Sequence, residues 1–377
     1  MATNKKIIIS INTTWNFVNF RVGLIKALLN KNWEITAIAP ADKYVKDLKQ
    51  LNCNYIHLLM HNKSTNPIRD LFLFWRFYLI LYHERPAIFL GYTVKPNIYG
   101  SLAAHALGIP VINNIAGLGT IFINNSWITH LVHFLYWLAL SRSAKVFFQN
   151  NDDLDLFVKH RIVRIEQTER LPGSGVDLSR FTPVPLPSLQ FKKQIRFLLI
   201  ARMLWDKGVG EYVAAARIVR QNHPNAEFCL LGQLSVQNPA AIDSTQMRQW
   251  KAEGMVRYLG TSDDVRVEIA DADCIVLPSY YREGVPRTLL EAAAMGRPII
   301  TTDAVGCREV VNDGVNGYLC KTRNVIDLAE KIIKMLKLSP EDRTEMGRQG
   351  RAKVEREFDE KIVIQKYLDA IQEVTSS

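Results

Sequence analysis

Residues 274–302 read CIVLPSYYREGVPRTLLEAAAMGRPIITT, and this stretch predicts the fold of the region around it. The apolar run Cys274–Leu277 is typical of a buried strand, and Pro298–Thr302 is a second such run. Between them, Glu283-Gly-Val-Pro is loop-like. A helix is expected to start at Pro286, where the missing N–H of proline costs nothing. Strand, helix and strand in this order favour parallel pairing in an α/β sheet.

The same alternation of short apolar runs and helical patterns extends through the chain. In the first half it predicts a parallel sheet with helices on both faces, two of them at Phe17–Asn30 and Pro96–Leu107. The strands expected there are Lys6–Ile11, Ile35–Ala39, Asn54–Leu58, Ala87–Leu90, Val111–Asn113 and Lys145–Gln149. A second series comprises Ile195–Ala201, Ala226–Leu231, Val256–Leu259, Cys274–Leu277, Pro298–Thr302 and Gly317–Leu319.

A proline-rich segment separates the two series. Residues 182–189 hold three prolines, which disfavour both helix and sheet, so this is the expected linker. We therefore predict an α/β protein of two doubly wound, Rossmann-like domains, residues 1–187 and 188–358, with ligands at the strand ends in a cleft between them. By fold analogy, a C-terminal helix at about residues 359–377 is expected to pack back on the first domain.

Positive charge is concentrated in the first half. The 377 residues carry a formal charge of +10, and residues 1–187 hold 20 Lys and Arg against 11 Asp and Glu. A basic half predicts an anionic partner: nucleic acid, phospholipid or a phosphate-bearing substrate. Five scattered cysteines without a CxxC pair favour buried thiols in a reducing compartment. The N-terminus lacks the apolar core of a signal peptide, so a cytoplasmic location is expected.

Two segments, Ile68–Tyr82 and Trp127–Leu140, are unusually aromatic and apolar. Each is shorter than the roughly 20 residues that a membrane-spanning helix needs. One interpretation is a buried helix of the first domain. The other is a helix lying on a membrane, with aromatic rings at headgroup depth. Basic residues that could face anionic lipid are Arg69, Arg76, Arg85, Arg142 and Lys145.

Two carboxylates flank the helix start at Pro286. Glu283 precedes the helix and Glu291 lies inside it, so they can bind opposite ends of one ligand through its hydroxyls. The helix N-terminus between them is suited to a diphosphate. A bare pair of glutamates at this spacing would more often be surface residues, but the surrounding residues change that interpretation.

The segment resembles the E-x7-E motif of the GT4 family of retaining, GT-B glycosyltransferases, including the strand before it and the Ala-Met-Gly-Arg-Pro-Ile-Ile after it. The resemblance implies that Glu283 holds donor-sugar hydroxyls and Glu291 the ribose. The expected donor-binding set is Glu283, Gly284, Val285, Pro286, Arg287, Thr288 and Glu291, with Gly232 and Gly260 at two strand ends.

Residues 201–209, ARMLWDKGV, resemble the R-x4-K-G element of the same family. The resemblance implies that Arg202 and Lys207 hold the donor diphosphate and, with Glu283, form the catalytic set. Two cations at this place remove the need for a metal ion, so no metal and no cofactor are expected beyond a UDP-sugar co-substrate. Softer matches are the segments Gly173–Pro183 and Asp303–Gly317.

The first half departs from the family pattern. Residues 12–16, NTTWN, stand where many members have Gly-Gly, and residues 113–120 lack the usual His. Asn16, Arg21 and Lys95 are the candidates for acceptor binding, each of which could equally be structural. The half resembles a subgroup that builds lipid-linked bacterial glycans, including α-1,3-N-acetylgalactosaminyltransferases acting on undecaprenyl-diphosphate sugars.

The resemblance implies a retaining glycosyltransferase that moves a sugar from a UDP-sugar to a polyprenyl-diphosphate-linked saccharide. The expected sugar is N-acetylgalactosamine, or another N-acetylhexosamine or hexose. Such an enzyme would lie peripherally on the inner face of the cytoplasmic membrane. The alternatives are a GT-B nucleotide-sugar epimerase and a non-catalytic nucleotide- or polyanion-binding protein. Nucleic-acid-binding motifs are not evident. A dehydrogenase would need G-x-G-x-x-G after its first strand, and neither domain start has this motif.

Overall fold

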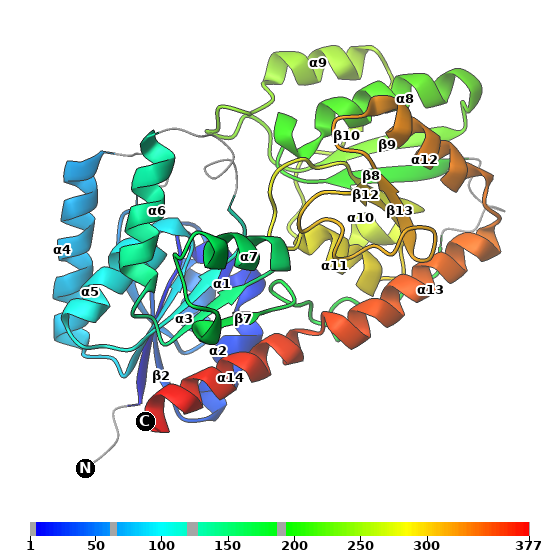
Figure 1. The fold of residues 1–377 in the computed structure, drawn as a ribbon. Helices are drawn as coiled ribbons and strands as arrows, with labels where there is room; N and C mark the ends of the chain where they lie inside the picture. Colours follow the sequence, from blue (N-terminus) through cyan, green and yellow to red (C-terminus); the bar gives the residue numbers. More distant parts are fainter. Residues whose placement is uncertain (1–4, 61–65, 119–126, 187–193, 377) are drawn as a thin grey trace. The chain divides into compact units, whose positions relative to one another are not determined.

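The computed structural model describes residues 5–60, 66–118, 127–186 and 194–376. They form two compact units, one of Met1–Ser174 with Glu360–Ser377 and one of Gly175–Asp359. Each unit holds one sheet whose strands all pair in parallel, with helices around it (Figure 1). The expected α/β class with two Rossmann-like domains is confirmed.

The sheet of the first unit has the order β3-β2-β1-β4-β5-β6-β7. Its strands are β1 (Lys6–Ser10), β2 (Glu34–Ala39), β3 (Asn54–His57), β4 (Ile88–Tyr92), β5 (Val111–Ile115), β6 (Lys145–Phe148) and β7 (Thr168–Arg170). Its helices are α1 (Thr14–Phe20), α2 (Val22–Asn30), α3 (Val45–Gln50), α4 (Pro67–Glu84), η1 (Pro96–Gly100), α5 (Ser101–Ala106), α6 (Trp127–Leu140), α7 (Asn151–Lys159), η2 (Ile165–Gln167) and α14 (Glu360–Ser376).

The single helix expected at Phe17–Asn30 is wrong in one respect. It is two helices that meet at Arg21, whose φ of −130° breaks the helical path. The first of them starts earlier, at Thr14, because Thr13 caps it through a hydrogen bond from the Asn16 amide to the threonine hydroxyl. The short polar strand β7 was not expected at all.

The sheet of the second unit has the order β10-β9-β8-β11-β12-β13. Its strands are β8 (Ile195–Ile200), β9 (Ala226–Leu231), β10 (Arg257–Tyr258), β11 (Cys274–Leu277), β12 (Ile299–Thr302) and β13 (Gly317–Cys320). Its helices are η3 (Trp205–Lys207), α8 (Val209–Asn222), α9 (Ser244–Ala252), α10 (Arg266–Ala270), α11 (Arg287–Ala294), α12 (Val325–Lys337) and α13 (Pro340–Glu357).

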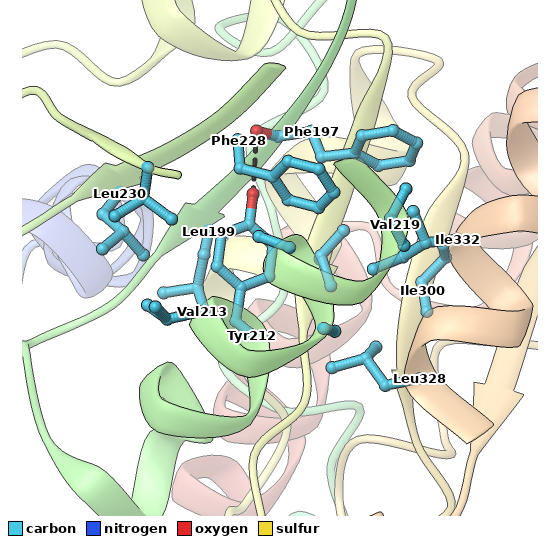
Figure 2. Close-up of a cluster of buried hydrophobic side chains, with 14 of the residues drawn as sticks. Phe197, Leu199, Tyr212, Val213, Val219, Phe228, Leu230, Ile300, Leu328 and Ile332 are labelled. Atoms are coloured by element: carbon cyan, nitrogen blue, oxygen red, sulfur yellow. Dashed lines mark hydrogen bonds between the residues drawn. The ribbon is translucent and has the colours of Figure 1, made fainter. Parts of the chain in front are cut away.

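Aromatic packing fills one face of this second sheet. Figure 2 shows Phe197 of β8 and Phe228 of β9 beside Tyr212 of α8, all at most 1% exposed. The Tyr212 hydroxyl donates to the Phe197 carbonyl at 2.9 Å, so its polar atom is paired inside the core. All five cysteines are buried and free, in keeping with the expected buried thiols.

The boundary expected at residue 187 lies too late in the chain. Val176 and Phe181 are buried in the core of the second unit, and the Val176 amide donates to the Phe358 carbonyl at 2.9 Å. Arg297, fully buried, donates to the carbonyls of Val184 and Pro185 at 2.7 and 3.0 Å. The described part of the proline-rich segment is therefore clamped to the second unit, and residues 187–189 lie outside the description.

The C-terminal helix α14 belongs to the first unit. Its buried face joins the core formed by β1, β2, β4 and α2 through Val363, Tyr367, Ala370 and Ile371. The Tyr367 hydroxyl accepts a hydrogen bond from the Asn114 side-chain amide at 2.8 Å, which ties the helix to the end of β5.

The aromatic helix α4 has two apolar faces with different surroundings. One face, with Leu73, Phe77 and Leu81, packs into the core of the first unit. The other face is open, with these exposed fractions: Ile68 66%, Leu71 59%, Phe72 65%, Trp75 51%, Leu79 53% and Tyr82 48%. The helix α6 also exposes apolar residues, Leu131, Phe134, Trp137 and Leu138. Among the described helices, none is long and apolar enough to cross a bilayer.

Candidate active site

The two sequence motifs of the second unit meet where its sheet changes direction. From β8 the chain builds β9 and β10 on one side, then returns to place β11 on the other side of β8. The carboxyl ends of β8 and β11 therefore border the switch point, where open α/β sheets bind ligands. Residues 201–208 follow β8, and residues 278–286 follow β11.

The loop after β8 is pressed against the loop after β11. Gly208 has φ of +74°, and a Cβ there would lie 2.1 Å from the Pro278 carbonyl oxygen, so only glycine fits. The Asp206 carbonyl accepts hydrogen bonds from the Tyr280 and Tyr281 amides, each at 3.0 Å. These contacts fix Lys207, which lies between Asp206 and Gly208, beside the second loop.

Lys207 and Glu283 form an ion pair inside this junction. Their side chains are only 12% and 13% exposed. The same Glu283 oxygen, Oε1, accepts a hydrogen bond from the Ser279 hydroxyl at 3.1 Å. The Lys207 ammonium also lies 4.9 Å from the centre of the Tyr281 ring. The two residues predicted to be catalytic are thus in contact, and Ser279 and Tyr281 fix their side chains.

The Asp206 side chain is a buried acid in the same place. Burial raises its pKa, while the positive charge of Lys207 opposes the rise and the negative charge of Glu283 adds to it. Arg202 is exposed at the end of β8 and contributes a smaller opposing charge. The structure therefore gathers two cations and two carboxyl groups around one strand end.

The helix α11 points its N-terminus at this region. It begins at Arg287 with Pro286 as its N-cap, one residue later than expected. The first amides of any helix have no partner within it, which makes them available to an anion. Gly306, with φ of +81°, lies so close that a Cβ would be 1.8 Å from the Gly284 carbonyl oxygen. The glycine-rich stretch after β12 thereby supports the Glu283-Gly284 turn.

Glu291 lies one helical turn beyond Arg287, whose Nε donates to it at 3.1 Å. Its side chain is 14% exposed. Burial raises the pKa of Glu291, and the charge and hydrogen bond of Arg287 oppose this rise. Arg287 was expected to contact the donor, and in this structure it pairs with the second glutamate. The ribose contact of Glu291 stays a prediction.

The remaining donor candidates have mixed positions. Val285 is 7% exposed and packs in the core, while Thr288 is partly exposed in the first turn of α11. Gly232 directly follows β9 and has φ of +143°, and a Cβ there would lie 1.8 Å from the Ala201 carbonyl oxygen. Its close approach is therefore to the β8 loop. Gly260, with φ of +80°, has open space at its Cβ position.

The first unit has a switch point of its own, between β1 and β4. A cavity of about 210 Å³ lies there, lined by residues that follow β1 and β4, by the end of β5 with the two residues after it, and by Tyr136 of α6. They are Asn12, Thr93, Val94, Lys95, Asn97, Ile115, Ala116, Gly117 and Tyr136.

The three acceptor candidates differ in how they are engaged. Lys95 is 8% exposed and paired with Asp70 of α4 at 2.5 Å. The Asn16 amide nitrogen donates to the side-chain oxygens of Thr13 and Asn12 at 3.2 and 3.4 Å. Arg21 is 6% exposed and lies over the Tyr92 ring.

Comparisons with known proteins fit this arrangement. The model described as Glycosyl transferase 4-like matches residues 6–150, and the model Glycosyl transferases group 1 matches residues 187–353. An N,N'-diacetylbacillosaminyl-diphospho-undecaprenol alpha-1,3-N-acetylgalactosaminyltransferase of Campylobacter jejuni is 30% identical, over 93% of this chain and 94% of its own. This chain belongs to the GT4 family of glycosyltransferases.

More distant relatives agree with the family. An Escherichia coli UDP-Gal:alpha-D-GlcNAc-diphosphoundecaprenol alpha-1,3-galactosyltransferase is 23% identical over 82% of this chain and 81% of its own. The structure of Anabaena HepE in complex with UDP has a TM-score of 0.79 at 16% identity, covering 98% of this chain and all of HepE. This last likeness establishes the GT-B fold. The names of the Campylobacter and Escherichia enzymes both specify undecaprenyl-diphosphate-linked sugars.

Sequence reasoning missed three parts of the site. Ser279 orients Glu283, the Asp206 carbonyl joins the two loops, and the Thr302 hydroxyl donates to the Ser279 carbonyl. Ser279 stands two residues after the end of β11 and four residues before Glu283, which is a usable signal. The other two contacts join residues far apart in the chain and have no local signature.

Proposed function

We propose that this GT4 enzyme transfers a sugar, with retention of anomeric configuration, from a UDP-sugar to a polyprenyl-diphosphate-linked saccharide. The observation that carries the donor half is the convergence of Lys207 and Glu283 at the switch point of the second unit. A cation for diphosphate and a carboxylate for sugar hydroxyls meet there, beside the N-terminus of α11.

Each donor group has a proposed role. Arg202 and Lys207 bind the diphosphate, together with the first amides of α11. Glu283 accepts hydrogen bonds from the sugar hydroxyls, and Glu291 from the ribose. No metal ion is required in this proposal, because the two cations and the helix N-terminus neutralise the leaving group.

The transfer step balances without another reactant. The acceptor hydroxyl oxygen forms a bond to the anomeric carbon while the bond from that carbon to the UDP β-phosphate oxygen breaks. Both occur on the same face of the sugar, and the acceptor proton passes to the departing phosphate oxygen. The products are UDP and the extended lipid-linked saccharide. Lys207 and Arg202 stabilise the charge that grows on the leaving oxygen.

The acceptor class is supported by the two relatives whose names specify undecaprenyl-diphosphate sugars. We propose N-acetylgalactosamine, or another N-acetylhexosamine or hexose, as the transferred sugar. A thermal-shift screen of UDP- and GDP-sugars tests the donor, because a ligand that binds only the folded state raises its melting temperature. The best donor is then combined with polyprenyl-diphosphate saccharides, and the product's anomeric configuration is determined by NMR.

The results separate the alternatives. A new glycosidic bond with the donor's own configuration supports the proposal, and an inverted bond contradicts the retaining step. Conversion of the UDP-sugar to its epimer without an acceptor would instead identify a nucleotide-sugar epimerase.

We also propose that the enzyme works on an anionic membrane surface, the inner face of the cytoplasmic membrane, through the exposed face of α4 and α6. Phe72 and Trp75 stand out from this face, and Arg69 and Arg76 line a groove beside Phe72. Aromatic rings with arginines beside them suit the headgroup layer of an anionic leaflet.

Vesicle co-sedimentation tests this surface. Replacing Phe72 and Trp75 by serine should release the protein from vesicles containing phosphatidylglycerol. Ile326→Ser is the matched control, because Ile326 is 59% exposed on α12 of the second unit. Equal retention of all variants would remove α4 as the membrane contact.

A further inference from the structure

Arg21 is a buried cation at the junction of α1 and α2. Arg21 is only 6% exposed, and its guanidinium carbon lies 4.4 Å from the centre of the Tyr92 ring. Stacking of this kind uses one face of the guanidinium plane. The N–H donors lie in the plane and point to its edges, so the ring contact leaves them available.

No carboxylate of the first unit forms an ion pair with Arg21 in the described structure. The Asp42 carboxylate accepts hydrogen bonds from the backbone amides of Thr14 and Trp15 at the start of α1. The Glu360 carboxylate lies against Gly23 at the start of α2. Neither pairs with the guanidinium, and the stretches of the chain outside the description contain no Asp or Glu.

The other inward cations of this unit behave differently. Lys95 is paired with Asp70, Lys6 with Glu84 and Lys145 with Glu169. A buried charge without a counter-ion is costly, and a cation–π contact offsets only part of that cost. A residue kept in this state is therefore suited to an anion that arrives from outside.

The position of Arg21 suggests which anion this is. Tyr92, over which it stacks, is the last residue of β4 at the switch point of the first sheet. The next residue, Thr93, lines the 210 Å³ cavity together with Asn12, Asn97 and the paired Lys95. Neutral amides and hydroxyls are suited to sugar hydroxyls, and a guanidinium is suited to phosphate oxygens.

We infer that Arg21 binds a phosphate of the acceptor's diphosphate and that the adjoining cavity receives the acceptor's sugar. This inference rests on the proposed function for the identity of the acceptor. It separates the three acceptor candidates, because Lys95 already has Asp70 as its partner and the Asn16 amide is bonded within its own turn.

Arg21→Met tests the inference, since methionine keeps an apolar contact with Tyr92 and removes the charge. Lys26→Met is the matched control, a loss of one exposed positive charge on α2, the helix that begins directly after Arg21. With a polyprenyl-diphosphate saccharide, kcat/KM of Arg21→Met should fall roughly 10- to 100-fold, mostly through KM, as expected for a lost charge-assisted contact. With an alkyl glycoside of the same saccharide, which lacks the diphosphate, Arg21→Met and wild type should differ less than about threefold. UDP-sugar binding and slow donor hydrolysis should not change.

Two outcomes overturn the inference: an undiminished kcat/KM with the diphosphate acceptor, or an equal loss with the alkyl glycoside. If wild type transfers to no lipid-linked acceptor, the proposed function fails, and calorimetric binding of farnesyl diphosphate still decides the case for Arg21. Wild type should bind it and Arg21→Met should not; equal binding by both overturns the inference. Vesicle binding is measured alongside, and a loss confined to phosphatidylglycerol vesicles would assign the anion to a lipid headgroup and overturn it too.

Discussion

From the Lys207–Glu283 ion pair we predict quantities that separate its structural role from its proposed catalytic role. The perturbations are Lys207→Met, Glu283→Gln and the double variant. Each single change leaves one charge, 12% or 13% exposed, without its partner. Breaking a fully buried pair costs ~3–5 kcal/mol. Since this pair lies at a strand end and is partly exposed, and since Ser279 can still donate to the side chain at position 283, we expect about 2 kcal/mol for each single variant.

The double variant removes both charges and should lie within about 1 kcal/mol of wild type, so the coupling energy is about 2–3 kcal/mol. Apparent melting temperatures should fall roughly 4–8 °C in the single variants and largely recover in the double variant. The matched control is the surface pair Arg217–Glu253, whose side chains are 43% and 31% exposed. Its coupling should be ~0.2–1 kcal/mol.

Catalysis should respond in a different pattern. Each single variant should lose about 100-fold or more in kcat/KM with the UDP-sugar, because each removes a contact to the reacting part of the donor. The double variant should recover stability and stay inactive, and its loss should be smaller than the product of the single losses. Additive losses of stability would refute the pairing. A folded Lys207→Met variant with wild-type kcat/KM would refute its place in the donor site.

Three further predictions follow from single contacts. Ser279→Ala should lower kcat about 5- to 10-fold with little effect on folding, because the hydroxyl orients a charged group, and steady-state kinetics measure this. Gly208→Ala should disrupt the donor loop, since its Cβ would lie 2.1 Å from a carbonyl oxygen, and UDP affinity should fall well before the sheet's circular dichroism changes. Burial raises the pKa of Glu227, but the hydrogen bond and the charge of Arg196 outweigh it and hold this pKa below the ordinary 4.5. The Glu227–Arg196 pair therefore stabilises the folded state above pH 4.5, and this stabilisation is lost as the pH falls through the lowered pKa. Glu227→Gln should therefore cost about 1–2 kcal/mol at pH 7 and flatten the acid limb of a urea-unfolding series below pH 4.5; an unchanged acid limb would remove this pair as its cause.

The fold was predictable because most strands are buried on both faces. A parallel strand such as Cys274–Leu277 is an unbroken apolar run, and such runs are visible in the sequence. The strand Thr168–Arg170 escaped notice because it lies at the sheet edge and is polar. The domain boundary was misplaced because the proline-rich segment is held by Arg297, whose acceptor carbonyls are more than 100 residues away in the chain. A sequence pattern contains no sign of such a clamp.

The site was predictable only in its parts. The motifs indicated Lys207 and Glu283 separately, but their pairing across 76 residues depends on which strands become neighbours. The order of strands follows from the whole sheet and from no single segment. The pairing of Arg287 with Glu291 and the burial of Arg21 are of the same kind, since each depends on what packs around the residue.

The two switch points differ in one respect that bears on how the enzyme would work. In the second unit Lys207 already has a carboxylate partner, whereas in the first unit Arg21 has none. A donor diphosphate that binds Lys207 would remove the counter-ion of Glu283. The donor's sugar hydroxyls would then donate hydrogen bonds to Glu283 Oε1, in place of the one lost from Lys207. We therefore expect UDP alone, which has the diphosphate and no sugar, to bind at the cost of an unpaired Glu283. Wild type should then bind a UDP-sugar more tightly than UDP, and the ratio of these two affinities should be smaller in Glu283→Gln. An equal ratio in both proteins would contradict the replacement of Lys207 by sugar hydroxyls at Glu283.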